Sequence, residues 1–148
     1  MRFHLIDRID HVVPAESIAA RKLTSRLEPY WRDHGRGPEM PGALALEALC
    51  QAGSWLVLIS TELRKRAALL SVDRVRLGPP IRPGDVLALD GVVESINADR
   101  AVLSGAVRTG GEVVVAAEAL MCALVDTEDL ESIEDVSRMR RGLERPDR

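Results

Sequence analysis

Two side chains in the first third of the sequence, His34 and Glu47, are of types that transfer protons in enzymes, and a glutamine, Gln51, follows the second. His34 lies in a short loop rich in glycine and proline. Glu47 and Gln51 follow in the apolar stretch PGALALEALCQAGSWLVLISTELR, residues 41–64. Residues four positions apart share a face of a helix, so Glu47 and Gln51 lie side by side if this stretch is helical. A histidine on a loop before a helix that carries a carboxyl group is suited to acid–base catalysis.

The stretch 41–64 predicts one long helix. Pro41 suits the first turn, and Gly53 alone interrupts a run dominated by alanine and leucine after Gly42. Apolar residues surround the helix almost completely, which predicts burial on both sides. The predicted end lies near residues 64–66, where arginine and lysine suit the C-terminal dipole. A carboxylate is rarely buried without a partner or a task. The alternative is that Glu47 faces solvent or caps a neighbouring loop.

The residues around this helix resemble a known family. HGRGPEMPGALALEALCQAG, residues 34–53, is similar to the signature of the bacterial β-hydroxyacyl-acyl carrier protein dehydratases, roughly H-F-P-G-R-P-x-M-P-G-x-L-x-x-E-A-x-A-Q. The match is ungapped over residues 40–51 and includes Met40, Pro41, Gly42, Leu44, Glu47, Ala48 and Gln51. Three more segments resemble strands of the family: FHLIDRIDHVVPAE, RVRLGPPIRPGD and EVVVAAEALMCALVD. Together the similar segments extend over residues 3–126.

The resemblance implies an α+β hot-dog fold, in which an antiparallel β-sheet wraps around a long central helix. It implies conversion of carrier-linked 3-hydroxyacyl thioesters to trans-2-enoyl thioesters in fatty acid or polyketide-type synthesis. His34 would be the base and would meet Glu47, the acid, across the interface of a dimer. The N–H groups of Gly42 and Ala43 would hold the thioester oxygen, and Gln51 would steady the carboxylate or the hydroxyl. Neither a cofactor nor a metal is needed.

The histidine loop departs from the family pattern by one residue. The family has nine residues from the histidine to the glycine of M-P-G, whereas His34 precedes Gly42 by eight, and the phenylalanine is missing. A one-residue deletion keeps His34 as the base, and an ungapped alignment puts Asp33 in its place. Two other functions therefore stay open. One is a hot-dog thioesterase or hydratase, and the other is a catalytically silent homologue that binds acyl carrier protein.

The rest of the chain predicts a sheet that positions these residues. Strands are expected on either side of a turn at Pro14–Ala15, at residues 3–13 and 16–27. Four more form an antiparallel meander after the helix, at residues 67–77, 86–96, 100–108 and 112–125. The length of 148 residues fits one hot-dog domain, residues 1–125, followed by a charged tail, residues 126–148. In the tail, residues 131–141 have the apolar spacing of a short helix that is either solvated or docked.

Charge and composition exclude several classes of function. The chain has 23 acidic and 20 basic residues, and the tail holds eight of the acidic and five of the basic ones, so residues 1–125 are neutral. A neutral body argues against general nucleic-acid binding. No apolar run reaches membrane-spanning length without a polar interruption, and no secretory leader opens the chain, so a cytoplasmic protein without membrane contact is expected. Cys50 and Cys122 lie in apolar segments and are expected to be reduced core residues, and no spacing suggests a metal site.

Other polar and aromatic residues have weaker claims. His4 and His11 lie in the first strand segment, where a structural or surface role is expected. Four arginines are either the rim of an entrance for an acidic carrier protein or scattered solvated charges: Arg74, Arg76, Arg82 and Arg108. Trp31 and Trp55 are expected in the core or in a tunnel wall. An edge strand and a helix too apolar for a monomer surface predict a homodimer or a trimer of dimers.

Overall fold

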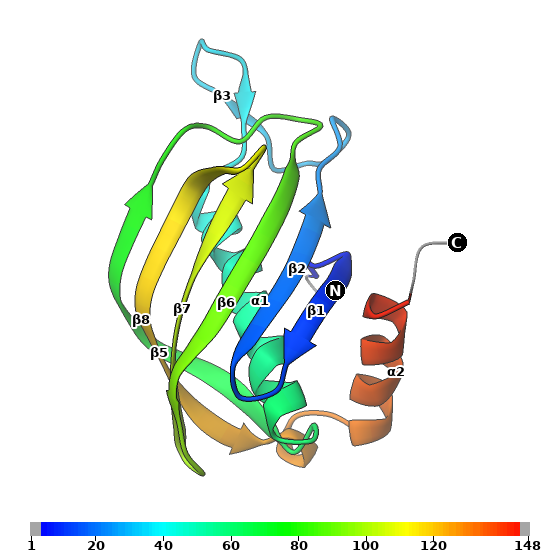
Figure 1. Cartoon of the computed structure of the whole chain (residues 1–148). Coiled ribbons are helices and arrows are strands. Elements are labelled where there is room, and N and C mark those ends of the chain that lie inside the picture. Colours follow the sequence, from blue (N-terminus) through cyan, green and yellow to red (C-terminus); the bar gives the residue numbers. More distant parts are fainter. Residues whose placement is uncertain (1–3, 146–148) are drawn as a thin grey trace.

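The computed structural model describes residues 4–145, in which one curved sheet wraps around one long helix (Figure 1). Small and aliphatic side chains fill the space between them. This is the expected α+β hot-dog arrangement. The elements are, in chain order, β1 (Arg8–Val13), β2 (Ser17–Leu23), β3 (Arg32–Asp33), β4 (Pro38–Glu39), α1 (Gly42–Ser60), β5 (Lys65–Leu77), β6 (Val86–Ile96), β7 (Arg100–Thr109), β8 (Glu112–Asp126), a single 3-10 turn (Thr127–Asp129) and α2 (Ile133–Leu143).

The large sheet has the strand order β1-β2-β6-β7-β8-β5, with every neighbouring pair antiparallel. The predicted meander is confirmed for β6, β7 and β8, with β6 bounded as expected and β7 and β8 each one residue longer at their ends. It is wrong for the first of its four strands, because β5 pairs with β8 at the far edge of the sheet and β2 takes the place beside β6. The turn after β6 is held by Asn97 Oδ1, which accepts from the N–H groups of Asp99 and Arg100 at 2.8 and 2.9 Å. Strand β5, 13 residues long, forms one edge of the sheet.

Small residues let α1 approach the sheet closely. Ala45, Ala48 and Ala52 are fully buried on the helix. On β7, Gly105 leaves room for the helix: a Cβ there would lie 2.9 Å from Leu49 Cδ1 and would clash with the backbone of β6. The contact between α1 and the sheet therefore depends on the missing side chain at this position.

The end of α1 differs from the sequence prediction. The helix stops at Ser60 rather than near residues 64–66. Glu62 and Leu63 adopt positive φ values of 53° and 66°, and the N–H of Leu63 donates to the carbonyl of Leu58 at 2.7 Å. This left-handed closure satisfies the last carbonyls and buries Leu63. The basic residues then belong to β5, where Lys65 pairs with Asp126 at 2.6 Å instead of ending the helix.

The first two strands are shorter than predicted. Strand β1 begins at Arg8, because residues 5 and 6 precede the sheet as buried irregular backbone, and Phe3 lies outside the described residues. Strand β2 ends at Leu23, where the chain turns around Ser25. The predicted turn at Pro14–Ala15 is present, with Ala15 at φ 63°.

The C-terminal segment forms a helix that docks on the body, which decides between the two alternatives left open by the sequence. Helix α2 lies beside β1 (Figure 1), and Val136 is 1% exposed within the core. Ser132 caps the helix by accepting from the N–H of Asp135, and basic residues occupy the last turn. Packing of one apolar stripe holds an otherwise charged segment in place.

By length and composition alone, α1 is also apolar enough to cross a membrane. In the structure its buried residues contact β2, β5, β6, β7 and β8. The helix is therefore the core helix of this fold.

Gly105→Ala should lower the free energy of unfolding by about 1–3 kcal/mol, because the added methyl group overpacks the contact between α1 and the sheet. Gly142→Ala is the matched control. Gly142 lies in α2 with open space around its Cα, so alanine there should be neutral or stabilise the helix by up to ~1 kcal/mol. Urea unfolding of the three proteins measures both changes, and equal stability of wild type and Gly105→Ala would contradict the packing argument.

Candidate active site

The N-terminus of α1 is free of side-chain caps. Pro41 occupies the N-cap position, its ring cannot accept a hydrogen bond, and no acidic residue lies in the first turn. The N–H groups of Gly42 and Ala43 have no carbonyl one turn earlier in the helix. They are therefore positively polarised donors, suited to a carbonyl oxygen that gains negative charge.

Glu47 is held by two successive hydrogen bonds. The Nε2 of Gln51 donates to Glu47 Oε1 at 3.1 Å, and the backbone N–H of Leu5 donates to Gln51 Oε1 at 2.8 Å. The segment before β1 thus fixes the orientation of the Gln51 amide. The amide then presents its NH₂ group to the carboxylate. This confirms the predicted proximity of Glu47 and Gln51 and adds a residue, Leu5, that no side-chain pattern indicates.

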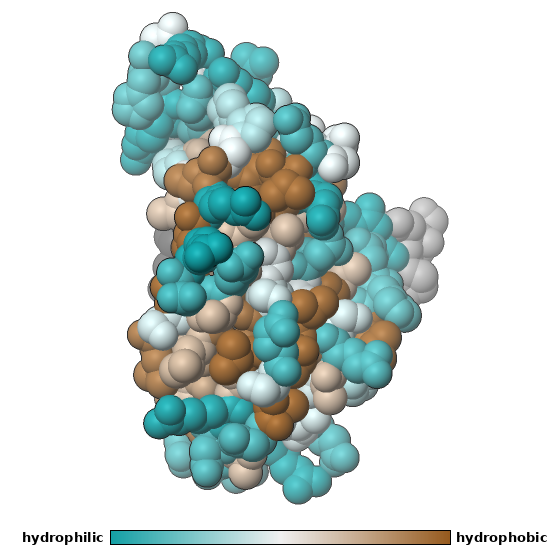
Figure 2. All heavy atoms as spheres, turned by 60° about the vertical axis from the view of Figure 1, so that its left-hand side comes forward, coloured by the Kyte–Doolittle hydropathy of each residue, from teal (hydrophilic) through white to brown (hydrophobic). Residues whose placement is uncertain are grey.

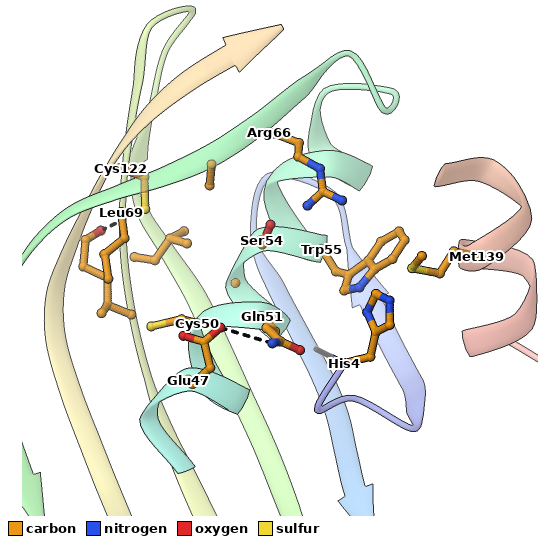
Figure 3. Close-up of a pocket in the computed structure, with 14 residues that line it drawn as sticks. His4, Glu47, Cys50, Gln51, Ser54, Trp55, Arg66, Leu69, Cys122 and Met139 are labelled. Atoms are coloured by element: carbon orange, nitrogen blue, oxygen red, sulfur yellow. Dashed lines mark hydrogen bonds between the residues drawn. The ribbon is translucent and has the colours of Figure 1, made fainter. Parts of the chain in front are cut away.

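A cavity of about 330 Å³ runs along this side of α1 (Figure 3). Glu47, Cys50, Gln51, Ser54 and Trp55 come from the helix. The opposite wall comes from β5, β7 and β8, and His4 and Met139 lie beside Trp55. The remaining lining residues are Gly53, Arg66, Ala67, Leu69, Leu103, Leu120 and Cys122.

Glu47 is exposed in the single chain, as in the alternative that this carboxylate faces solvent, and the predicted burial of both sides of α1 is wrong at this position for one chain. The sheet covers only the face of α1 that carries Ala45, Ala48 and Ala52, and Glu47 lies on another face.

His34 lies away from this cavity. Strands β3 and β4 form a two-stranded hairpin that projects beyond the end of the large sheet (Figure 1), and His34 is exposed in its turn. Asp33 holds this turn: its Oδ1 accepts from the N–H groups of Gly35 and Gly37 at 2.7 and 3.1 Å. Both glycines have positive φ, which tightens the turn. The Asp33 carboxylate is thus engaged within its own loop, and the imidazole is the outward group.

The base of the hairpin is tied to the loop before β6. The N–H of Met40 donates to the carbonyl of Ile81 at 3.0 Å, and both side chains are buried. Arg82 donates to the carbonyl of Pro38 at 3.2 Å and pairs with Glu39 at 3.4 Å. These contacts fix where the hairpin leaves the body.

The weaker candidates occupy structural or surface positions. Three of the four arginines pair with carboxylates of their own chain: Arg74 with Glu118, Arg82 with Glu39 and Arg108 with Asp90. His11 is exposed on β1, His4 is exposed at the cavity, and Trp55 is buried in the cavity wall. The indole of Trp31 donates to the carbonyl of Ser25 at 2.8 Å.

Both cysteines are free thiols in the cavity wall. Burial raises the pKa of Cys50 to about 11, and the nearby Glu47 carboxylate adds to the rise. Burial also raises the pKa of Cys122. A high pKa keeps both groups protonated at neutral pH, which argues against a nucleophilic thiol. Among residues 4–145, no cluster of three or more histidine, cysteine, aspartate or glutamate side chains could hold a metal ion.

Comparison with known proteins relates this arrangement to one family. The family model described as FabA-like domain matches residues 1–118. The chain belongs to the FabA-like family. A 3-hydroxyacyl-[acyl-carrier-protein] dehydratase FabZ from Caulobacter sp. is 36% identical over 127 residues, which cover 83% of this chain and 77% of the relative. A dehydratase FabZ from Myxococcus xanthus is 39% identical over 92 residues, 60% of each chain.

Solved structures share the fold of this family member. The dehydratase heterocomplex ApeI:P from Xenorhabdus doucetiae matches with a TM-score of 0.64 and 19% identity, over 91% of this chain and 88% of that one. A thioesterase from Haemophilus influenzae matches with a TM-score of 0.63 and 15% identity, over 82% and 79% of the two chains. At these identities the likeness establishes the fold alone.

Sequence reasoning missed the contributions of Leu5, Arg66 and Met139 to this site. A backbone N–H such as that of Leu5 leaves no trace in side-chain patterns. Met139 did have a signal, because it continues the apolar spacing of Ile133 and Val136 on one face of the tail helix. The apolar spacing could not indicate where that helix lies relative to α1.

The native protein should react slowly with iodoacetamide at pH 8. With its pKa raised from 9.0 to about 11, Cys50 has roughly a hundredfold less thiolate than an ordinary cysteine. The labelling rate should rise about tenfold per pH unit between pH 8 and 10. Mass spectrometry counts the modified thiols, and protein unfolded in urea is the control that should label quickly. Rapid labelling of the folded protein at pH 8 would contradict a buried thiol.

Proposed function

We propose that this protein is a 3-hydroxyacyl-[acyl carrier protein] dehydratase, a lyase that acts on acyl thioesters of fatty acid or polyketide-type synthesis. A base removes the proton from C2 of the acyl chain, and the electron pair forms the C2–C3 double bond. The C3 hydroxyl receives a proton and leaves as water. The thioester oxygen carries negative charge while C2 loses its proton. The product is the trans-2-enoyl thioester.

The observation that carries this proposal is the oriented Glu47–Gln51 pair beside an uncapped helix N-terminus. Glu47 lies one turn and a half inside α1, and Gln51 fixes its carboxylate at 3.1 Å. In the proposed mechanism, Glu47 gives the proton to the C3 hydroxyl. The N–H groups of Gly42 and Ala43 hold the thioester oxygen. His34 of a second subunit takes the C2 proton, because imidazole titrates near neutral pH. No bound cofactor takes part.

A second subunit is part of the proposal, because one chain leaves its apolar surface uncovered. Figure 2 shows apolar side chains gathered between polar ones on the side where β5 and β8 lie. Exposed apolar residues on these strands are Leu69, Leu70, Val75, Leu77, Val113 and Met121. Apolar patches of this kind mark interaction surfaces. A second copy on this face would surround Glu47 with apolar groups and complete a homodimer, the unit from which a trimer of dimers could also form.

The relatives support dehydration over hydrolysis. The FabZ dehydratase from Caulobacter sp. matches 83% of this chain at 36% identity, whereas the thioesterase shares only the fold at 15% identity. A thioesterase would release a free thiol from a saturated acyl thioester, which a thiol reagent detects. An acyl carrier protein is the proposed carrier, with coenzyme A as the smaller substitute, and the proposed compartment is the cytoplasm.

Glu47→Gln should lower the hydration of a crotonyl thioester, the reverse reaction, by about 10²–10⁴-fold, because the amide keeps the shape but cannot deliver a proton. Loss of enoyl absorbance measures the rate. Glu62→Gln is the matched control: Glu62 follows the same helix, is exposed and pairs with Arg64 on the surface, so its activity should equal wild type. Near-normal activity of folded Glu47→Gln would assign the acid to another residue.

His34→Ala should also be inactive, and mixing it with Glu47→Gln should restore activity. If each site takes its histidine and its glutamate from different subunits, a mixed dimer holds one site with both native residues. Subunits exchanged at random should then recover about a quarter of wild-type activity. Asp33→Asn should stay active, because its amide oxygen can still accept from the N–H groups of Gly35 and Gly37. Full activity of His34→Ala, or no recovery on mixing, would overturn the role of His34 across the interface.

A further inference from the structure

The C-terminal helix closes one end of the cavity that begins at Glu47. Met139 projects from α2 toward Trp55 of α1 in Figure 3, and both line the cavity. Helix α2 lies beyond residues 1–118, the part of the chain that the FabA-like family model matches. The end of the cavity is thus built from a segment that the family match does not include.

From this geometry we propose that α2 is a chain-length stop: Met139, beside Trp55, limits how far the acyl chain can extend along α1. The inference rests on the proposed function, because it takes the cavity as the site of the acyl chain. The specificity-determining side chain is Met139, whose thioether lies where the methyl end of a longer chain would have to pass.

The direction of the acyl chain follows from the polarity along α1. The thioester end belongs at Gly42 and Glu47, near the start of the helix. From Glu47 the lining continues through Cys50, Gly53 and Ser54 to Trp55, which is ~12 Å further along the axis at 1.5 Å per residue. Gly53 has no side chain to fill the space between α1 and Leu103 of β7, where a Cβ would lie 3.0 Å from Leu103 Cδ1.

The wall opposite the helix is apolar and so suits an alkyl chain. It includes Leu69 of β5, Leu103 of β7 and Leu120 of β8. Arg66 also borders the cavity, but its guanidinium is paired with Glu131, so its charge is compensated. An alkyl chain on this path therefore has an apolar wall opposite the helix, with Gln51 and Ser54 on the helix side and Met139 at the far end.

The same ion pair holds the stop in place. Glu131 belongs to the connection between β8 and α2, and its side chain is 13% exposed where it meets Arg66 of β5. Val136, one helical turn before Met139, is 1% exposed in the core. Both anchors precede Met139 in the chain, and Met139 cannot move aside without breaking this largely buried ion pair or exposing Val136.

The cavity volume of about 330 Å³ lies near the lower limit of ~300–1,000 Å³ for small-molecule pockets.

The test compares full-length wild type, Met139→Ala, Met139→Trp and the control Leu143→Ala on four-carbon and sixteen-carbon enoyl thioesters, because only the longer chain exceeds the path from Glu47 to Trp55. Leu143 lies on the same helix and packs against the core without lining the cavity. Met139→Ala should raise the ratio of kcat/KM for sixteen carbons over four carbons at least tenfold, and Met139→Trp should lower it. Leu143→Ala should leave the ratio unchanged.

An unchanged ratio in both Met139 variants would overturn the inference, as would an equal change in Leu143→Ala, which would indicate general loosening of α2. If wild type turns over no thioester, the proposed function fails, and binding decides the inference instead. Quenching of Trp55 fluorescence by saturated four-carbon and sixteen-carbon acyl-coenzyme A then gives the same ratio, with Trp55→Phe as the blank. Tighter binding of sixteen carbons to Met139→Ala supports the stop, and equal ratios or no binding at all overturn it.

Discussion

The packing of α1 onto the concave face of the sheet is the contact on which the rest of this structure depends. Alanines on the helix and a glycine on β7 bring the two backbones close, and leucine and valine side chains fill the remaining space. The core is aliphatic because the chain has only four aromatic residues. Once this face of α1 is committed to the sheet, the direction of every other helix side chain is fixed at 100° per residue. Glu47 and Gln51 are placed on the other side by that rotation.

That placement explains why Glu47 is exposed in one chain. The sheet can cover only one face of a helix, and α1 is apolar on nearly all of them. Strand β5 adds a long edge with exposed leucines beside the same helix. A carboxylate in water is a weak general acid at neutral pH, since it has already lost its proton. The proposed second subunit would supply both the dry surroundings of Glu47 and the histidine, so assembly and chemistry would depend on the same surface.

Two short segments outside the large sheet define the ends of the site. The β3–β4 hairpin is fixed at its base by the buried Met40 and the Arg82 contacts, and its turn is held by Asp33. At the other end, the docked tail helix brings Met139 to Trp55. Both segments are charged and short, and each is held by a single buried side chain plus polar ties. Variation in such segments changes what a site accepts while the helix and sheet stay the same.

The sequence alone determined the features that repeat locally. Long runs of alternating or β-branched residues separated by Asn-Ala-Asp and Gly-Gly turns predict the strands β6 to β8 almost residue by residue, because register and turn chemistry act over a few positions. The four-residue spacing of Glu47 and Gln51 likewise predicts their contact. Only the tertiary structure decided the end of α1, where a left-handed turn buried Leu63 against the core and overrode the preference of basic residues for a helix terminus. It also decided that Glu47 is exposed in one chain and that the tail helix reaches the cavity. In the hairpin turn it decided that Asp33, rather than His34, makes the hydrogen bonds within the loop. Each of these depends on contacts between residues far apart in the chain, whose energies no local pattern contains.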